Sequence, residues 1–147
     1  MTLDRFKLVA AVHVFFVDDE KILMLRRRNT GYEDGNYSVP AGHVDGDETI
    51  RNAGKRESRE ETSVKVAVDD FQLAHVMHRN AADAERIDFF LVTTNWQGEP
   101  TNAEPEKCDD LSWFPIGRLP ANTIPYVRTA IEHFRDEVSY SEFGWEG

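Results

Sequence analysis

The chain has 147 residues, of which 40% are hydrophobic and 11% aromatic, and this is enough apolar material for one domain with its own core. Its formal charge of −10 argues against polymeric DNA or RNA, and against an anionic membrane, as partners held by bulk attraction. A single cysteine, Cys108, excludes an internal disulfide, and the sequence shows neither a signal pattern nor a membrane-spanning apolar run. We therefore expect one cytoplasmic domain over residues 1–147 that acts on a small ligand.

The first part of the chain has the pattern of a β-hairpin. Residues 7–17 are almost continuously apolar, which is typical of a strand buried on both faces. After a polar turn, residues 21–25 return as a second strand. The hairpin then delivers three consecutive arginines, Arg26, Arg27 and Arg28, to one rim of the predicted sheet. Such a run is often only a solvated strand end, so the role of each arginine stays open at this point.

A polar, turn-rich loop over residues 29–37 carries two tyrosines, Tyr32 and Tyr37. Loops of this kind often carry recognition, so both tyrosines are candidates for contact with a substrate. The competing interpretation is that they only cover the sheet edge.

A short strand is expected over residues 38–44. Pro40 within it indicates an edge position or an interrupted ladder, because proline has no N–H to donate. The small pair Ala41 and Gly42 allows the backbone to come close to a neighbouring group.

The next segment predicts a helix that begins at Ile50 and is capped by Thr49. At about 100° per residue, Glu57 and Glu61 continue the apolar stripe of this helix, with Glu60 at its edge. An ordinary amphipathic helix would place its glutamates opposite its buried side. Carboxylates that converge under cover repel one another and are costly to desolvate unless a cation joins them. The pattern therefore indicates a site for a hard divalent metal ion.

The spacing around this helix resembles the signature of the Nudix hydrolases, G-x5-E-x7-R-E-U-x-E-E-x-G-U, in which U is a bulky apolar residue. Its fixed polar and glycine positions are met by Gly42, Glu48, Arg56, Glu57, Glu60 and Glu61. Ser58 and Ser63 depart from the signature, which has an aliphatic residue and a glycine there. We expect Ser58 to lose about 1 to 2 kcal/mol of burial against the sheet. Ser63, if it ends the helix in the left-handed conformation, costs about 1 kcal/mol relative to glycine.

The resemblance implies a fold and an activity. The implied fold is α/β, the Nudix α/β/α sandwich with a central mixed β-sheet, over a core of about residues 5–137. The implied activity is hydrolysis of the pyrophosphate linkage in a nucleoside diphosphate derivative, with Mg²⁺ as the cofactor and Mn²⁺ as a further candidate. The metal ligands that the resemblance implies are the helix carboxylates and one backbone carbonyl, at Glu57, Glu60, Glu61 and Ala41.

The resemblance also implies supporting roles. Arg56 would orient the catalytic carboxylates and Glu48 would brace the preceding loop against the helix, although a purely structural salt bridge would pair the same residues. In the family, a basic residue that leaves the second strand commonly meets substrate phosphate. Arg27 or Arg28 is the candidate for that contact.

The group that activates the attacking water differs between branches of the family. Four carboxylates remain open for this role, namely Glu60, Glu61, Glu104 and Glu106. The last two stand in a long loop over residues 95–110, and a loop of this length in a compact domain tends to be functional. Its run from Glu104 to Cys108 resembles a branch that hydrolyses nucleoside triphosphates, including oxidised guanine nucleotides. On that basis we expect Glu106 to be the better candidate.

Downstream of the helix, the pattern predicts further strands and a second helix. The strands are expected at residues 64–68, 71–78, 86–94 and 111–114, and the helix at residues 126–138. The aromatic tail over residues 138–147 either packs back on the domain or meets a second subunit, which leaves a monomer and a homodimer both open. The histidines show no zinc-like spacing.

The expected substrate is a nucleoside triphosphate, normal or modified, cleaved to the monophosphate and pyrophosphate. The loop tyrosines and Trp96 could stack one base, and the chain has no insertion with which to grip a second nucleoside or sugar. A pyrophosphatase for ADP-ribose, nucleotide sugars or dinucleotides is the alternative. A non-catalytic Nudix sensor is disfavoured because such modules usually lose the glutamates of the signature. A calcium-binding helix is disfavoured because the acids lack the spacing of a calcium loop.

Overall fold

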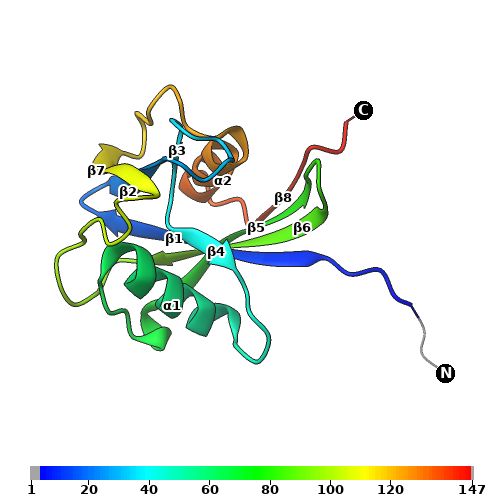
Figure 1. Ribbon diagram of the computed structural model, residues 1–147, viewed down its shortest axis with the longest axis horizontal. Helices are drawn as coiled ribbons and strands as arrows, with labels where there is room; N and C mark the ends of the chain where they lie inside the picture. Colours follow the sequence, from blue (N-terminus) through cyan, green and yellow to red (C-terminus); the bar gives the residue numbers. More distant parts are fainter. Residues whose placement is uncertain (1–3, 147) are drawn as a thin grey trace.

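The structure is a computed structural model that describes residues 4–146, and it contains one mixed sheet between two helices. In chain order the elements are β1 (Val9–Asp18), β2 (Lys21–Arg27), β3 (Tyr37–Ser38), β4 (Ala41–His43), α1 (Ile50–Thr62), the 3₁₀ turn η1 (Val68–Asp70), β5 (Gln72–Asn80), β6 (Glu85–Thr93), β7 (Cys108–Pro115), α2 (Pro125–Arg135) and β8 (Tyr140–Phe143). The strand order is β3-β2-β1-β6-β5-β8, with β4 paired to β1 and β7 paired to β2. Helices α1 and α2 lie on opposite sides of this sheet (Figure 1).

The predicted hairpin is confirmed. Strands β1 and β2 pair antiparallel, with Val17 opposite Ile22 and Asp18 opposite Lys21. The connecting residues Asp19 and Glu20 both have positive φ, 50° and 61°, and two such residues are what the tightest hairpin turns require.

Strand β1 changes partner along one of its edges. It pairs with β4 over residues 11–13 and with β2 only at residues 17–18, while its other edge pairs parallel with β6 over residues 9–16. Between the two partners, the Val14 amide donates to the carbonyl oxygen of Pro40 at 2.8 Å. The predicted interruption at Pro40 is therefore confirmed, because the proline separates β3 from β4. The sheet splits at this point, and the candidate site lies beside the split.

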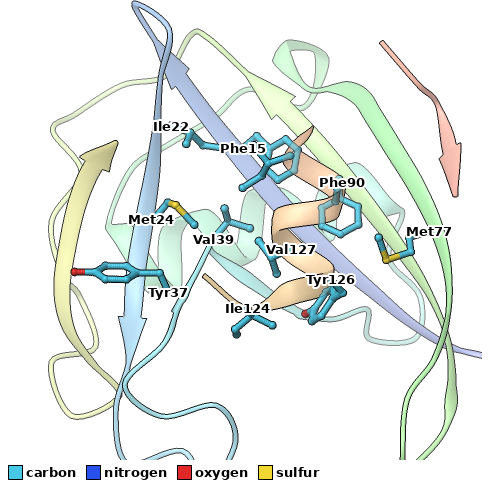
Figure 2. Close-up of a cluster of buried hydrophobic side chains, with 12 residues drawn as sticks. Phe15, Ile22, Met24, Tyr37, Val39, Met77, Phe90, Ile124, Tyr126 and Val127 are labelled. Atoms are coloured by element: carbon cyan, nitrogen blue, oxygen red, sulfur yellow. The ribbon is translucent and has the colours of Figure 1, made fainter. Parts of the chain in front are cut away.

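Alternate side chains of β1 pack into two separate cores. Val12, Val14 and Phe16 face α1, where they pack with Ala53 and Leu91. The intervening Phe15 faces α2, in the core shown in Figure 2 with Phe90, Met77 and Val127. A strand that is buried on both faces reads as a continuous apolar run, as predicted for this segment. Two helices over the two faces of a mixed sheet confirm the predicted α/β/α sandwich.

The local signals of α1 are also confirmed. The Thr49 side chain accepts a hydrogen bond from the Asn52 amide at 3.1 Å, and Ser63 closes the helix with φ 64°. Ser58 is fully buried, and its hydroxyl donates to the carbonyl oxygen of Gly54 at 2.7 Å, so no hydroxyl is left without a partner. A side chain at Gly54 would press on Leu91, since an added Cβ would lie 2.8 Å from its Cδ1. The helix therefore packs closely on the sheet.

One predicted strand and two predicted boundaries were wrong. The strand expected at residues 64–68 is not formed: Lys65 makes one isolated bridge to Gln97, and the chain then turns into η1. The apolar alternation does correspond to burial, because Val64 and Val66 are buried. The segment is extended, but it does not pair with a neighbouring strand. Strand β7 begins earlier than residue 111, and α2 ends before residue 138, where Glu137 adopts a positive φ of 59°.

The aromatic tail packs back on the domain. Strand β8 pairs parallel with β5, with Val76 opposite Tyr140, and the indole of Trp145 donates to the carbonyl oxygen of His78 at 3.0 Å. Of the two alternatives that the sequence left open for the tail, the structure shows packing against the domain. Among the residues from 4 to 146, no helix is both long and apolar enough to cross a membrane.

Candidate active site

A cavity of about 480 Å³ opens beside α1, β4, the end of β2 and the loop that precedes β7. We call it the acidic cavity. Its charged lining residues are Arg27, Glu57, Glu60, Glu61, Glu104 and Lys107. It thus collects the predicted helix glutamates in one place, together with a carboxylate and a cation from a loop far away in the sequence.

Glu57 lies against the backbone of β4. The residue is 8% exposed, and a Cβ added at Gly42 would overlap its carboxylate. Gly42 is therefore needed because only a hydrogen fits between this strand and the Glu57 side chain. Burial raises the pKa of Glu57, while hydrogen bonds with Glu61 and Arg56 act in the opposite direction.

Glu61 is the most strongly perturbed acid of the site. One of its carboxylate oxygens accepts a hydrogen bond from the Ala41 amide at 2.9 Å. Burial, followed by repulsion from Glu57, raises its pKa well above the usual range for glutamate. Glu57 therefore disfavours the charge of Glu61, whereas the hydrogen bond with Glu61 favours the charge of Glu57. A bound cation would reverse that effect, because it would stabilise both ionised forms.

Arg56 connects the loop before α1 to the acids of the helix. Its Nε and Nη2 donate to the two carboxylate oxygens of Glu48 at 3.0 and 2.9 Å, and its Nη1 donates to Glu57 at 2.6 Å. Nη2 also donates to the carbonyl oxygen of His43 at 3.1 Å. The hydrogen bond from Arg56 lowers the pKa of Glu48, and the Glu48 carboxylate in turn raises the pKa of Arg56. The structure therefore brings Arg56 and Glu48 together as the sequence predicts.

The donors of the acidic cavity fit a hard divalent cation. Glu57, Glu60, Glu61 and Glu104 supply only oxygen, which is the ligand atom that Mg²⁺ and Mn²⁺ prefer. Two of these carboxyls have pKa values raised by burial. Over the range that the structure describes, 4–146, no three His, Cys, Asp or Glu side chains stand close enough together to hold an ion as they are. Glu57 is instead bound by Arg56, and Glu61 by the amide of Ala41.

The loop before β7 contributes Glu104 to this cavity, whereas Glu106 is exposed and does not line it. Glu104 is close enough to Glu61 to raise its pKa by repulsion. The loop is held by local hydrogen bonds, from the Glu104 amide to Asn102 at 3.1 Å and from the Lys107 amide to the carbonyl oxygen of Glu104 at 2.9 Å. Of the two loop acids, the structure therefore places Glu104 at the acidic cavity and Glu106 outside it, although the sequence favoured Glu106.

A second cavity of about 800 Å³ adjoins the first and shares Arg27 and Ala41 with it. We call it the aromatic cavity. Its lining includes two tyrosines, a histidine and two more arginines, namely Tyr32, Tyr126, His13, Arg79 and Arg86. A group attached to a phosphate in the acidic cavity would therefore find aromatic and cationic surface next to it.

Of the two predicted phosphate contacts, the structure places only Arg27 at the cavities. Its Nε donates to the carbonyl oxygen of Tyr32 at 2.7 Å, and its guanidinium lies 5.3 Å from the centre of the Tyr32 ring. Tyr32 itself is 48% exposed and lines the aromatic cavity, so it is available to a ligand. Arg28 is exposed and lines neither cavity. It binds the neighbouring loop through its amide, which donates to the carbonyl oxygen of Lys107 at 2.9 Å.

Two aromatic candidates belong to the packed interior instead. Tyr37 is a member of the buried cluster in Figure 2 and is 8% exposed. Its hydroxyl donates to Asp110, and its ring packs on Phe114. Trp96 packs against Phe16 and stacks on Trp113, away from both cavities. The expectation that Tyr37 and Trp96 contact a base is therefore not supported by their positions, because their rings are used to cover the two cores.

The sequence interpretation missed the polar groups at the wall of the aromatic cavity. Arg79 and Asp88 form a buried ion pair at 2.7 Å, and the Arg79 guanidinium lies 3.7 Å from the centre of the Tyr126 ring. The Tyr126 hydroxyl lies 3.0 Å from Nε2 of His13. Burial lowers the pKa of His13 to about 4, so this imidazole is neutral at neutral pH. The available signal was Asp88, which directly precedes the apolar residues Phe89 to Val92 of β6, whereas Arg79 stands among polar residues at the end of β5.

The carboxylate-bearing helix that lines one cavity, beside a second cavity with arginines and tyrosines, fits the metal-assisted hydrolysis of a phosphate anhydride. Comparison with known proteins identifies the family. The family model described as NUDIX domain matches residues 7–134. The chain belongs to the Nudix family, and it is a pyrophosphohydrolase that acts on nucleoside diphosphate derivatives.

Solved structures agree with this assignment. A MutT NUDIX hydrolase from Burkholderia pseudomallei has 27% identity and a TM-score of 0.78, and the match covers 86% of this chain and 98% of that one. The MutT protein from Methanosarcina mazei Go1 has 20% identity and a TM-score of 0.75, with coverage of 92% and 98%. A bifunctional NMN adenylyltransferase/ADP ribose pyrophosphatase from Francisella tularensis, complexed with AMP and Mn ion, has 19% identity and a TM-score of 0.71, with coverage of 90% and 42%.

Proposed function

We propose that the chain, acting as one domain over residues 1–147, hydrolyses a nucleoside 5′-triphosphate, normal or modified, to the monophosphate and pyrophosphate. The observation that carries this proposal is the pair of adjoining cavities that share Arg27. The acidic cavity suits a cation and the phosphate chain, and the aromatic cavity suits one nucleoside. The formal charge of −10 favours such a small ligand over polymeric nucleic acid.

Glu57, Glu60 and Glu61, with the carbonyl oxygen of Ala41, would hold Mg²⁺, or Mn²⁺ in its place. When bound, such an ion neutralises phosphoryl oxygens and increases the acidity of a coordinated water. Arg56 has a positioning role in this arrangement. Since its Nη1 donates to Glu57 while Glu48 holds its other nitrogens, it fixes the direction of the Glu57 carboxylate.

Glu104 is the group that we propose as the acceptor of the proton from the attacking water. It lines the acidic cavity but comes from the loop before β7 and not from α1. Backbone hydrogen bonds within this loop hold it in place. The hydroxide equivalent would then attack a phosphorus atom, and the pyrophosphate would leave with its charge balanced by nearby cations. Glu60 and Glu61 remain the helix-borne alternatives for the same role.

Arg27 and Lys107 are the side chains that would contact the phosphate oxygens. Both line the acidic cavity. Among residues 4–146, the Arg27 side chain donates only to the carbonyl oxygen of Tyr32, and the Lys107 ammonium is 4.0 Å from Glu104. Their positive charges would reduce the repulsion between the glutamates of the cavity and the negatively charged phosphates of the substrate. Tyr32, exposed beside Arg27, would cover the sugar or base.

A pyrophosphatase for ADP-ribose, nucleotide sugars or dinucleotides is a competing function, because the aromatic cavity of about 800 Å³ has room for more than one ring. A turnover screen with Mg²⁺ and with Mn²⁺ over nucleoside triphosphates, ADP-ribose, sugar nucleotides and dinucleoside polyphosphates separates the two. We expect the highest kcat/KM for a triphosphate. A value for ADP-ribose or a nucleotide sugar more than about tenfold above every triphosphate, roughly 1.4 kcal/mol in transition-state binding, would replace the triphosphate proposal.

A further inference from the structure

Arg79, near the end of β5, is a charged side chain that is buried at the wall of the aromatic cavity. The residue is 8% exposed, yet it lines the cavity together with Tyr32 and Tyr126. A charge at this depth is costly without a partner. Asp88 in β6 is fully buried and provides that partner.

The ion pair uses only part of the guanidinium. Arg79 donates from Nε to Oδ2 of Asp88 at 2.7 Å and from Nη2 to Oδ1 at 3.2 Å. An arginine has further N–H donors on its two terminal nitrogens. Within residues 4–146, Nη1 of Arg79 makes no hydrogen bond. Since the side chain lines an open cavity, a ligand can supply the acceptor that the protein does not.

The surroundings hold the guanidinium in one orientation. Its Cζ lies over the Tyr126 ring, 3.7 Å from the ring centre, and the Tyr126 hydroxyl is itself 3.0 Å from Nε2 of His13. The His13 ring stacks on Phe90 at a centroid distance of 4.3 Å, inside the core. A donor that is fixed on both sides selects a ligand by geometry, because it cannot swing away from a group that offers no acceptor.

We propose that Arg79 is a specificity-determining residue: it donates to an exocyclic carbonyl oxygen of the base, so the enzyme prefers nucleotides whose base carries a carbonyl over adenine nucleotides. The proposal rests on the proposed function, in which the nucleoside occupies the aromatic cavity. Carbonyl and ring-nitrogen acceptors on one base edge match the fork of an arginine. An exocyclic amino group at that position is a donor, and it would face the Arg79 donors without a bond.

Inosine and adenosine nucleotides form a matched pair for this test, since they differ only at C6, a carbonyl in one and an amino group in the other, and at N1, an N–H donor in inosine and an acceptor in adenosine. We expect kcat/KM for inosine triphosphate to exceed that for ATP by at least about tenfold. In Arg79→Gln the ratio should fall below about threefold, mainly through a higher KM for inosine triphosphate.

Arg79→Gln leaves the Asp88 carboxylate buried without its partner, which can unfold the protein. The double variant Arg79→Met with Asp88→Asn removes both charges and gives the same test without that effect. Arg118→Gln, an exposed arginine that lines neither cavity, is the matched control and should keep the full ratio. Thermal unfolding reports whether each variant is folded.

A binding measurement makes the test independent of turnover. Titration calorimetry of inosine and adenosine monophosphate against the unmodified chain, without metal, should give at least about tenfold tighter binding of the inosine nucleotide. Equal affinities, or a ratio that both Arg79 variants keep, would overturn the proposal. If triphosphates are hydrolysed without this discrimination, the role of Arg79 fails and the proposed function stands. If no triphosphate is hydrolysed but the binding ratio depends on Arg79, the proposed function fails and the role of Arg79 stands.

Discussion

The two cavities are assembled from the chain in opposite ways. The acidic cavity takes most of its carboxylates from one helix, where Glu57, Glu60 and Glu61 follow one another within a single turn. The aromatic cavity takes its polar groups from separate elements, such as His13 in β1 and Arg79 in β5. Helical periodicity makes the first set readable in the sequence, while only the pairing of strands brings the second set together. Under the proposed function, the metal-holding carboxylates are thus encoded locally, whereas the nucleoside-binding groups are brought together at long range.

Their charges differ as well. Carboxylates predominate in the acidic cavity, and Arg27, Arg79 and Arg86 contribute cationic groups to the aromatic one. Loss of a group from the acidic cavity should therefore reduce turnover, and loss of a group from the aromatic cavity should change affinity, selectivity or stability. The following predictions test this division.

The largest effect is expected for the helix carboxylates. Glu57→Gln and Glu61→Gln should each lower kcat at least about 100-fold at saturating Mg²⁺, because a neutral amide holds the cation poorly. Steady-state kinetics with circular dichroism as a folding check measures this. Glu99→Gln, an exposed acid outside both cavities, is the control and should leave kcat unchanged. Near-normal turnover in either helix variant would remove these residues from the metal site.

The next effect concerns the loop before β7. Glu104→Gln should reduce kcat roughly 100-fold and change the acidic limb of its pH profile, as expected for the loss of a general base. Glu106→Gln should do neither, since Glu106 is exposed and outside the acidic cavity. If both variants keep the kcat and the pH profile of the unmodified chain, the base lies on the helix, at Glu60 or Glu61.

A smaller effect is expected at β4. Gly42→Ala adds a methyl group where a Cβ would overlap the Glu57 carboxylate, and the displaced acid should cost about tenfold in kcat. Gly46→Ala is the matched control in the next loop, since a Cβ there would meet nothing within 4 Å. Both variants should stay folded by thermal unfolding. Equal kinetics in the two alanine variants would show that the close approach at Gly42 is not required.

The smallest effect is on stability and belongs to the aromatic cavity. Burial depresses the pKa of His13 from 6.5 to about 4, so in this range the unfolded chain binds more protons than the folded one. Acidification should therefore remove stability, by roughly 1 kcal/mol between pH 7 and pH 5.5. Asp88, Arg79 and Arg86 are the charged groups that act on this imidazole.

Urea titrations at both pH values, on the unmodified chain and on His13→Gln, isolate this contribution. The variant should lose less stability on acidification, by about the same roughly 1 kcal/mol, because glutamine does not titrate. An identical pH dependence in the two proteins would mean that His13 is protonated at little cost in the folded state.

Much of the fold was predictable because its signals are local. The cap at Thr49, the left-handed Ser63 and the break at Pro40 each depend on neighbours in the chain, and all three are found as expected. The tail could not be placed in this way. The four residues of β8 pair with β5 in a distant part of the chain, with Tyr140 opposite Val76, and no local pattern indicates that partner.

The residues of the site also differ in whether local or long-range contacts position them. The resemblance to the family signature predicted that Arg56 and Glu48 act together, and the structure joins them, since one helix and its preceding loop carry both. It did not distinguish Glu104 from Glu106, because the direction of a loop side chain depends on backbone bonds such as that to Asn102. Nor did it identify Tyr37 as a core residue, because the contact that buries it, with Phe114, joins distant segments.

The packing of β1 limits where insertions and deletions can be tolerated in the chain. Its even-numbered residues from Val12 to Phe16 pack under α1, and His13 and Phe15 face α2. Because side chains alternate with a period of two, one residue inserted or deleted within this strand would exchange the contents of both cores and move His13 to the wrong side. Indels should be tolerated in the connections on either side, and within β1 only in pairs.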